Sequence, residues 1–393
     1  MTKHEFPSVL STSTAVPVVP IASPGPVLPG GAGRPPTGGC PPAAHDDGAW
    51  FVPDGRVLQV LGVVRASGVA AAGVRFGRGM GRAALEGVLT AMILTAGEGL
   101  PMTVSSFTWM LHRGVSPRVR GLLGVRDGVG HALARARVVR LLDKLVPWGD
   151  ASGRCGPDRA SLDSTTGQLL EAAWSAQPGE ARDRWTGDVA FEGGFVEPAG
   201  RRVEPPAAPA GGDVDAGWLV RASDSAGGGR PRRWGYEVQL AVVVQPSPRR
   251  WVPGAVVGLR LHRPGLDRRP LWLGMLADTR ALRCREGCPK VGRGPGASRA
   301  WTDTGRRGPG PEFVRSARAL GYRVPARVIR SEGPSEPVRR ARAGAEAALA
   351  RAGASRQGAG SSLTGLWGTS LVVACELVAW NLGLARRGDP GRR

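Results

Sequence analysis

Three acidic residues stand at or just beyond the ends of predicted strands, where their carboxylates could do chemistry. Asp163 lies in the alternating segment 159–166, which predicts a buried strand. Asp303 follows a short apolar run, and Glu332 follows the β-branched segment 323–329. Because open α/β sheets build their sites at the carboxyl ends of strands, we expect the three carboxylates to converge.

Three converging carboxylates repel one another, and divalent cations resolve that repulsion. Mg²⁺ or Mn²⁺ with oxygen ligands would fit, and two such ions about 4 Å apart can activate a water or a 3′-hydroxyl for in-line displacement at phosphorus. Two alternatives remain open. Asp163 could instead cap the turn after its strand, and Asp278 rivals Asp303 as the second acid, although it lies inside a helical pattern.

The composition limits what the chain can be. Its 393 residues predict about two domains, and 60 Gly with 34 Pro indicate that part of the chain is not folded, above all a disordered leader over 1–49. The net charge of +21 favours a polyanionic partner such as DNA. The arginine excess could also reflect a GC-rich genome.

The five cysteines are scattered, which suits a reducing cytosol, and the C-x3-C pair at 284 and 288 has no second pair with which to bind zinc. The sequence shows no signal peptide and no apolar run of membrane-spanning length. We therefore expect a soluble, intracellular protein without a membrane partner.

Residues 80–148 predict a small all-helical domain of DNA-binding type. Its last helix, 132–146, displays a basic face whose alternative interpretation is an ordinary solvated surface. The candidate DNA-binding residues in this helix are Arg135, Arg137, Arg140 and Lys144.

Residues 158–385 predict an α/β domain with a mixed sheet and loop insertions, including a polar stretch over 176–212. The segment 234–244, WGYEVQLAVVV, is the clearest strand, and 255–261 is its expected antiparallel partner. A helix is predicted over 271–282. The basic loop before the clearest strand adds three candidate DNA-binding residues, Arg230, Arg232 and Arg233.

Several segments, in this order, resemble the DDE-type transposases of bacterial, particularly actinobacterial, insertion sequences: LEGVLTAMILTAGEGLPMTVSSFTWML, LDSTTG, DAGWLVRASD, RWGYEVQLAVVV, PEFVRSARALGYR and RSEG. The series carries the resemblance, from about Arg82 to the C-terminal helix. It implies a helical DNA-binding region followed by an RNase H-like catalytic core. It also implies that Asp163, Asp303 and Glu332 are the first, second and third acids of a Mg²⁺-dependent site that cuts and joins DNA.

The resemblance further implies double-stranded DNA partners (element ends and target), a homodimer and a cytoplasmic, nucleoid-associated bacterial protein. Two departures from the family pattern stand out. Asp303 is followed by Thr-Gly-Arg, and the connection 323–332 is shorter than in the family. The competing hypotheses are a catalytically inactive remnant or regulator that only binds DNA, and a metal-dependent nuclease that does not join strands.

Overall fold

The structure is a computed structural model that describes residues 51–75, 81–126, 128–145, 159–197, 216–220, 232–244, 254–285, 298–302, 309–325, 336–354, 363 and 365–387. All of them belong to one compact unit. The predicted leader, residues 1–49, lies outside the described residues.

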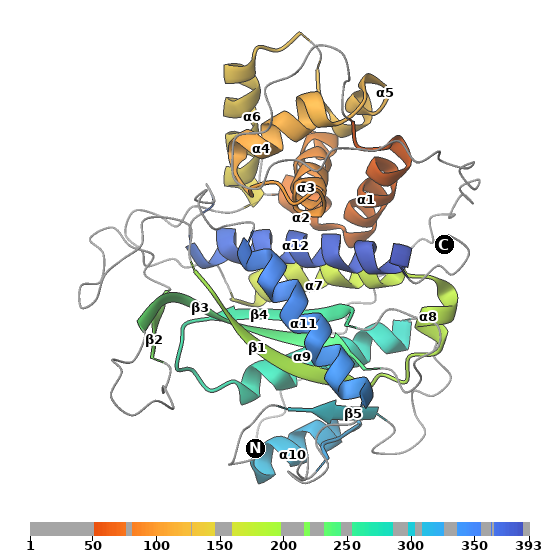
Figure 1. The fold of residues 1–393 in the computed structure, drawn as a ribbon, viewed down its shortest axis with the longest axis vertical. Coiled ribbons are helices and arrows are strands. Elements are labelled where there is room, and N and C mark those ends of the chain that lie inside the picture. The colour runs from red at the N-terminus through yellow and green to blue at the C-terminus, as the bar shows by residue number, and fades with distance from the viewer. Residues whose placement is uncertain are drawn as a thin grey trace, which may run out of the picture. The chain divides into compact units, whose positions relative to one another are not determined.

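The N-terminal part of the described chain is helical (Figure 1). It comprises α1 (Asp54–Ser67), α2 (Val69–Arg75), α3 (Arg82–Gly97), α4 (Val104–Trp109), the π-helical turn η1 (Met110–Gly114), α5 (Pro117–Arg120), the 3₁₀ turn η2 (Gly121–Leu123) and α6 (His131–Leu145). The helices predicted within 80–148 are confirmed, and α1 and α2 extend the helical part toward the N-terminus. Thr103 caps α4, because its Oγ1 accepts a hydrogen bond from the Ser106 N–H at 3.2 Å.

Helix α3 is the centre of this helical part. Every side chain from Ala84 to Ala96 is buried, including that of Glu86, whose carboxylate accepts hydrogen bonds from Arg65 of α1 at 2.9 Å and Arg82 at 2.6 Å. A buried carboxylate is tolerated when it is paired in this way. Gly87 lets the backbone of η2 approach, since a Cβ there would overlap the Leu123 carbonyl oxygen.

The second part combines helices and strands. It comprises α7 (Arg159–Ser175), α8 (Gly179–Asp183), β1 (Val189–Val196), β2 (Gly217–Val220), β3 (Arg232–Val243), β4 (Val256–His262), α9 (Arg269–Arg285), β5 (Ser298–Trp301), α10 (Pro311–Ala319), β6 (Tyr322–Arg323), α11 (Glu336–Ala354) and α12 (Gly365–Arg387). The predicted strands at 234–244 and 255–261 and the predicted helix at 271–282 are confirmed as β3, β4 and α9.

The strands form one mixed sheet. The long strand β3 pairs antiparallel with β1, β2 and β4, while β5 runs parallel to β1 and β6 runs parallel to β5. The predicted mixed α/β sheet is therefore confirmed. Strand β1 lies between the antiparallel and the parallel halves, which makes it the central strand of the sheet.

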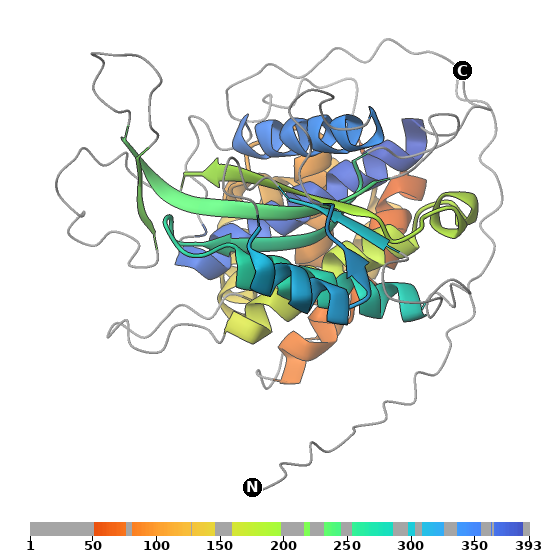
Figure 2. The same cartoon turned by 90° about the horizontal axis from the view of Figure 1, so that it is seen from below.

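Helices cover both faces of the sheet (Figure 2). Along β1 the side chains alternate: Ala190 and Val196 join the larger core with α11 and α12, whereas Val189 and Phe191 join the second core with α9 and α10. Phe191 stacks on Trp272 of α9, with ring centroids 5.5 Å apart. Both faces of β1 are thus buried, and its polar side chains must find partners inside the protein.

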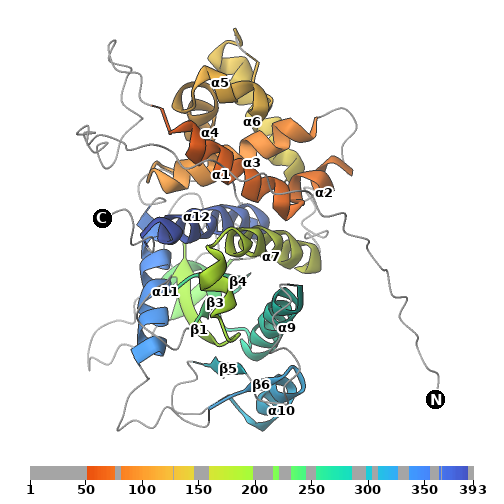
Figure 3. The ribbon, with the colours of Figure 1, turned by 90° about the vertical axis from the view of Figure 1, so that its right-hand side faces the viewer.

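Helix α12 is long and apolar enough over Gly365–Gly383 to cross a membrane by length and composition, contrary to the expectation that no run reaches that length. It is a core helix here, packed on α3, α7, α11 and β4 (Figures 1 and 3). Asn381 is a buried polar residue within this apolar helix. The Asn381 side-chain amide exchanges two hydrogen bonds with the Val256 backbone of β4, at 2.9 and 2.8 Å, so the buried amide is satisfied.

Two predictions about 159–212 were wrong. Segment 159–166 begins the helix α7 rather than a strand, because the residues that it buries recur at helical spacing, with Leu162 and Thr166 followed by Leu169 and Leu170. The Thr166 hydroxyl also bonds the Leu162 carbonyl one turn back. The stretch 176–212, predicted as a polar insertion, contains the central strand β1.

Candidate functional site

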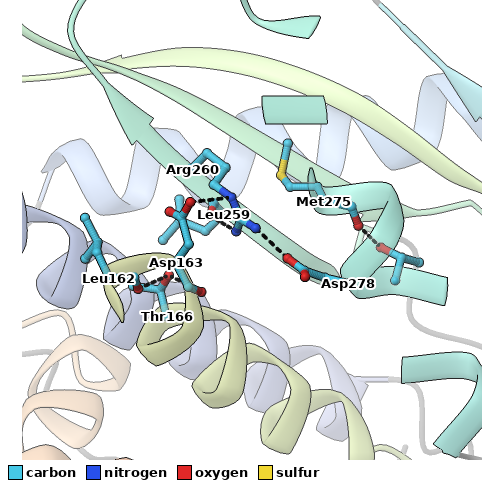
Figure 4. A network of polar contacts seen from close by, with 8 residues as sticks. Leu162, Asp163, Thr166, Leu259, Arg260, Met275 and Asp278 are labelled. Atoms are coloured by element: carbon cyan, nitrogen blue, oxygen red, sulfur yellow. Dashed lines mark hydrogen bonds and ion pairs between the residues drawn. The ribbon is translucent and has the colours of Figure 1, made fainter. Parts of the chain in front are cut away.

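Asp163, expected at a strand end, lies near the start of helix α7 and faces strand β4 (Figure 4). Its Oδ2 is 3.0 Å from the Nε of Arg260, and its side chain is about one-fifth exposed. The placement at a strand end was therefore wrong. The carboxylate has a cationic partner from its own chain.

All three guanidinium nitrogens of Arg260 have partners within the chain. Besides Asp163, its Nη2 donates to Asp278 Oδ2 at 2.5 Å and its Nη1 donates to the Leu259 carbonyl at 2.8 Å. The side chain of Arg260 is 6% exposed. A buried guanidinium needs such partners, so Asp163 and Asp278 are explained as the counter-charges that hold α7 and α9 to β4. Asp278 lies inside α9, as its helical pattern predicts.

The other two expected acids cannot be placed beside Asp163. Asp303 and Glu332 both lie outside the described residues. Among the described residues, no group of three or more His, Cys, Asp or Glu side chains could hold a metal ion. The guanidinium of Arg260 lies 3.0 Å from Oδ2 of Asp163 and neutralises the charge of that carboxylate.

Sequence reasoning missed an acid on the central strand. Glu192 lies midway along β1, on the face that α11 covers. Its Oε2 lies 3.7 Å from the Nε of Arg342 on α11, with the two side chains 12% and 22% exposed. The separation is too long for a hydrogen bond but places a full positive charge beside the carboxylate.

A signal for Glu192 exists in the sequence, although it is weak. The apolar run Val189-Ala190-Phe191 directly precedes the acid. The two glycines that follow, at 193 and 194, made the segment look like a loop, because glycine weakens strand propensity. Gly194 has a packing reason: a Cβ there would lie 2.6 Å from the side chain of Leu349 on α11.

A second buried polar cluster lies at the amino ends of β1 and β5. Asp188 Oδ1 accepts from the Arg299 N–H at 2.7 Å, and Arg283 donates to the Ser298 hydroxyl, which in turn donates to the Thr186 carbonyl at 3.0 Å. Burial raises the pKa of Asp188, against the lowering effect of its bond from Arg299 and of the nearby arginine charges. The cluster ties α9 to the strand ends.

The expected basic helix is α6, packed on α3 and α4. Arg135 and Arg140 are exposed and Arg137 is half-buried, beside Leu133, which is 66% exposed. Lys144 lies in α6, but its side chain is outside the described part. The exposed arginines leave a basic surface on the helical part.

The basic loop before β3 offers fewer described side chains as candidates for DNA binding. Arg230 lies outside the described residues, and Arg232 begins β3 with its side chain outside the described part. Arg233 is engaged within the chain: its Nη2 lies 3.0 Å from Glu197 Oε1, and its guanidinium lies over the Phe195 ring, 4.8 Å from the centroid. Among the described side chains, Arg135, Arg140 and Arg233 are all exposed, and Arg233 is engaged by Glu197 and Phe195.

No protein family model matches the chain, and no curated protein sequence matches it. Two solved structures that it matches in part are a pre-cleavage Mos1 transpososome (14% identity, 52% of this chain and 57% of that chain, TM-score 0.21) and a Mos1 mariner paired end complex with Mn (13% identity, 53% and 57%, TM-score 0.21). The chain thus spans less than two thirds of their length. Similarity at this level transfers neither a fold nor an activity.

Proposed function

We propose that this chain is a DNA-binding protein of the DDE transposase type that holds DNA without cutting it. The ordered series of sequence segments supports the transposase type. The mixed sheet supports an RNase H-like core, since it joins four strands paired antiparallel, β1 to β4, to two further strands, β5 and β6, that run parallel to β1, with helices on both faces. The net charge of +21 and the exposed arginines of α6 support a DNA partner.

The observation that carries the absence of cutting is the arginine that lies beside Asp163 and the one that lies beside Glu192. Arg260 lies 3.0 Å from Asp163, and Arg342 lies 3.7 Å from Glu192. Metal-dependent phosphoryl chemistry needs carboxylates free to bind Mg²⁺ or Mn²⁺. Carboxylates already neutralised by a fixed guanidinium lack that freedom, so we propose that neither acid serves as a metal ligand.

A second candidate is the active transposase, in which Mg²⁺ or Mn²⁺ bound by Asp303, Glu332 and either Asp163 or Glu192 supports strand cutting and joining. One observation favours it. Trp301, two residues before Asp303 in the sequence, pairs with Ala190, two residues before Glu192. Such an enzyme would place acids on neighbouring parallel strands. As part of either proposal, the protein is a cytoplasmic, nucleoid-associated homodimer.

One experiment separates the two candidates. The full chain is incubated with labelled duplex DNA and with supercoiled plasmid, with EDTA, Mg²⁺ or Mn²⁺. We expect fluorescence anisotropy to report binding in every buffer, and gels to report no nicked plasmid. Metal-dependent nicking that Asp303→Asn abolishes would establish the second candidate. Failure to bind duplex DNA at low salt would remove both.

A further inference from the structure

Glu192 occupies a position that the sheet makes special. It sits on β1, whose two neighbours in the sheet are antiparallel β3 and parallel β5. Its side chain lies on the same face as Ala190 and Val196, because alternate residues of a strand share a face. An acid on the buried face of a central strand is costly unless something compensates its charge.

Helix α11 brings that compensation close to the strand. Small buried residues, Ala341, Ala345 and Ala348, line its sheet-facing side. Gly194 makes room for Leu349, and Gly344 approaches Gly254 so closely that a Cβ on Gly254 would meet the Gly344 Cα at 2.8 Å. This packing fixes α11 on β1 (Figure 1). Arg342, one residue after Ala341, is therefore held over Glu192.

The guanidinium of Arg342 is largely removed from solvent beside the acid, since its side chain is 22% exposed. Its Nε is buried and forms no hydrogen bond, and it lies 3.7 Å from Glu192 Oε2. A guanidinium is always charged and more weakly hydrated than an ammonium, which suits it to a partly buried ion pair. By contrast, Mg²⁺ requires oxygen ligands at about 2.0 to 2.1 Å in near-octahedral geometry and keeps several waters. The Arg342 guanidinium places its charge 3.7 Å from Glu192 without such a coordination geometry or bound waters.

We propose that Arg342 is a built-in cation that takes the place of a divalent metal beside Glu192, and that this side chain is what keeps the metal out. The inference deepens the proposed function and rests on it. In this proposal a single residue, Arg342, makes a transposase-type core unable to bind the metal beside Glu192. Exchanging that residue for an acid then creates a pair of carboxylates, Glu192 and the new one, with affinity for Mn²⁺.

The test measures Mn²⁺ binding to the full chain by electron paramagnetic resonance of the free ion. Four proteins are compared: the wild type, Glu192→Gln, Arg342→Glu and the double variant. We expect equal Mn²⁺ binding for the wild type and Glu192→Gln. We expect Arg342→Glu to bind Mn²⁺ about tenfold more tightly than the wild type, a gain of about 1.4 kcal/mol. The double variant Glu192→Gln/Arg342→Glu should not show this gain. Comparing each background with its Glu192→Gln partner removes binding at other acids.

Two further variants make the result decisive. Arg339→Glu, on the exposed side of the same helix where Arg339 pairs with Glu336, changes the net charge equally, and any Mn²⁺ that it binds beside Glu336 should not depend on Glu192. Arg342→Gln serves if Arg342→Glu fails to fold, because it keeps a side chain of similar length without the charge. It should also bind more Mn²⁺ than the wild type, in a Glu192-dependent way.

Two outcomes overturn the inference. One is wild-type Mn²⁺ binding that Glu192→Gln abolishes. The other is folded Arg342 variants, checked by circular dichroism, that gain no Glu192-dependent binding. Duplex DNA binding is measured on the same samples. If the wild type does not bind duplex DNA, the proposed function is wrong, and the Mn²⁺ measurements still decide the role of Arg342.

Discussion

The Asp163 carboxylate lies 3.0 Å from the Nε of Arg260, so the acid expected to bind a metal instead neutralises a buried arginine. The arginine comes from β4 and the acid from α7, which are far apart in the sequence. The pair therefore has a structural task, namely to fix the helix on the strand. The same relationship recurs between Glu192 and Arg342, and it makes the stability of the α/β part sensitive to its charges.

Arg260→Met should lower the free energy of unfolding by about 2 to 3 kcal/mol, below the usual cost of breaking a buried pair because Asp163 and Asp278 are partly exposed. Urea unfolding followed by circular dichroism measures the loss. The double variant Arg260→Met/Asp163→Asn should recover part of it, since it removes both charges of the closer pair.

Arg233→Met is the matched control for Arg260. Arg233 pairs with Glu197 in the same way, but both side chains are about half exposed. Exposed pairs contribute about 0 to 1 kcal/mol, so the change should fall in that range. An equal loss in the two variants would mean that burial does not set the cost of the Arg260 pair.

How much of the fold could be predicted depends on how clearly the local sequence of each element determines its structure. The helix pattern of α3 and the β-branched run of β3 are dictated locally, so both were predicted from the sequence. Segment 159–166 misled because its small polar residues fit a strand pattern, while the burial of Leu169 and Leu170 is what makes it a helix.

The acid positions depended on non-local information. Arg260 pairs with Asp163 across about a hundred residues, and Arg342 pairs with Glu192 across more. Nothing in either local sequence marks such a partner. Residue type and spacing could propose carboxylates, but only the fold shows that two of them are neutralised from within the chain.

Gly187→Ala should destabilise the protein strongly. Gly187 has φ +85°, in the left-handed region, and a Cβ there would overlap the Arg283 guanidinium, which is anchored by Ser298. Backbone strain alone costs of order 1 to 3 kcal/mol, and displacing a buried arginine adds to it. Thermal unfolding measures the sum.

Gly265→Ala isolates the strain term. Gly265 has φ +89°, and no heavy atom lies within 4 Å of the position that a Cβ would take, so only the backbone conformation is disfavoured. Its loss should be the smaller of the two. Equal losses would show that the approach of Arg283 to Gly187 costs nothing when it is disturbed.

Asp188 should make stability fall as pH rises through its folded pKa. Burial raises the pKa of Asp188 above the ordinary value, so the folded state holds the proton more tightly than the unfolded chain. This contribution is complete below the unfolded pKa, near 3.9, and is lost as pH rises through the raised value. Asp188→Asn lacks it, so the variant should gain on the wild type in urea unfolding as pH rises above about 4.

Asp267 provides the control of opposite sign. Hydrogen bonds from Arg269 lower the pKa of Asp267, so its contribution is present above the unfolded pKa and is lost as pH falls through the lowered value. Asp267→Asn should therefore gain on the wild type toward low pH, with a small amplitude because the side chain is about half exposed. A common pH trend in both variants would refute the assignment to Asp188.

Arg135→Ala/Arg140→Ala on α6 should weaken binding to duplex DNA of any sequence and make it less dependent on salt. Both side chains are exposed, and each phosphate contact contributes about 0.9 to the slope of log K against log salt, so the slope should decrease by about 2. Fluorescence anisotropy across a salt series measures it. Arg339→Ala/Arg340→Ala removes the same charge from α11, where both arginines pair with Glu336, and should change the slope less. Equal slopes for the two double variants would show that DNA responds to net charge alone and that α6 is not the contact surface.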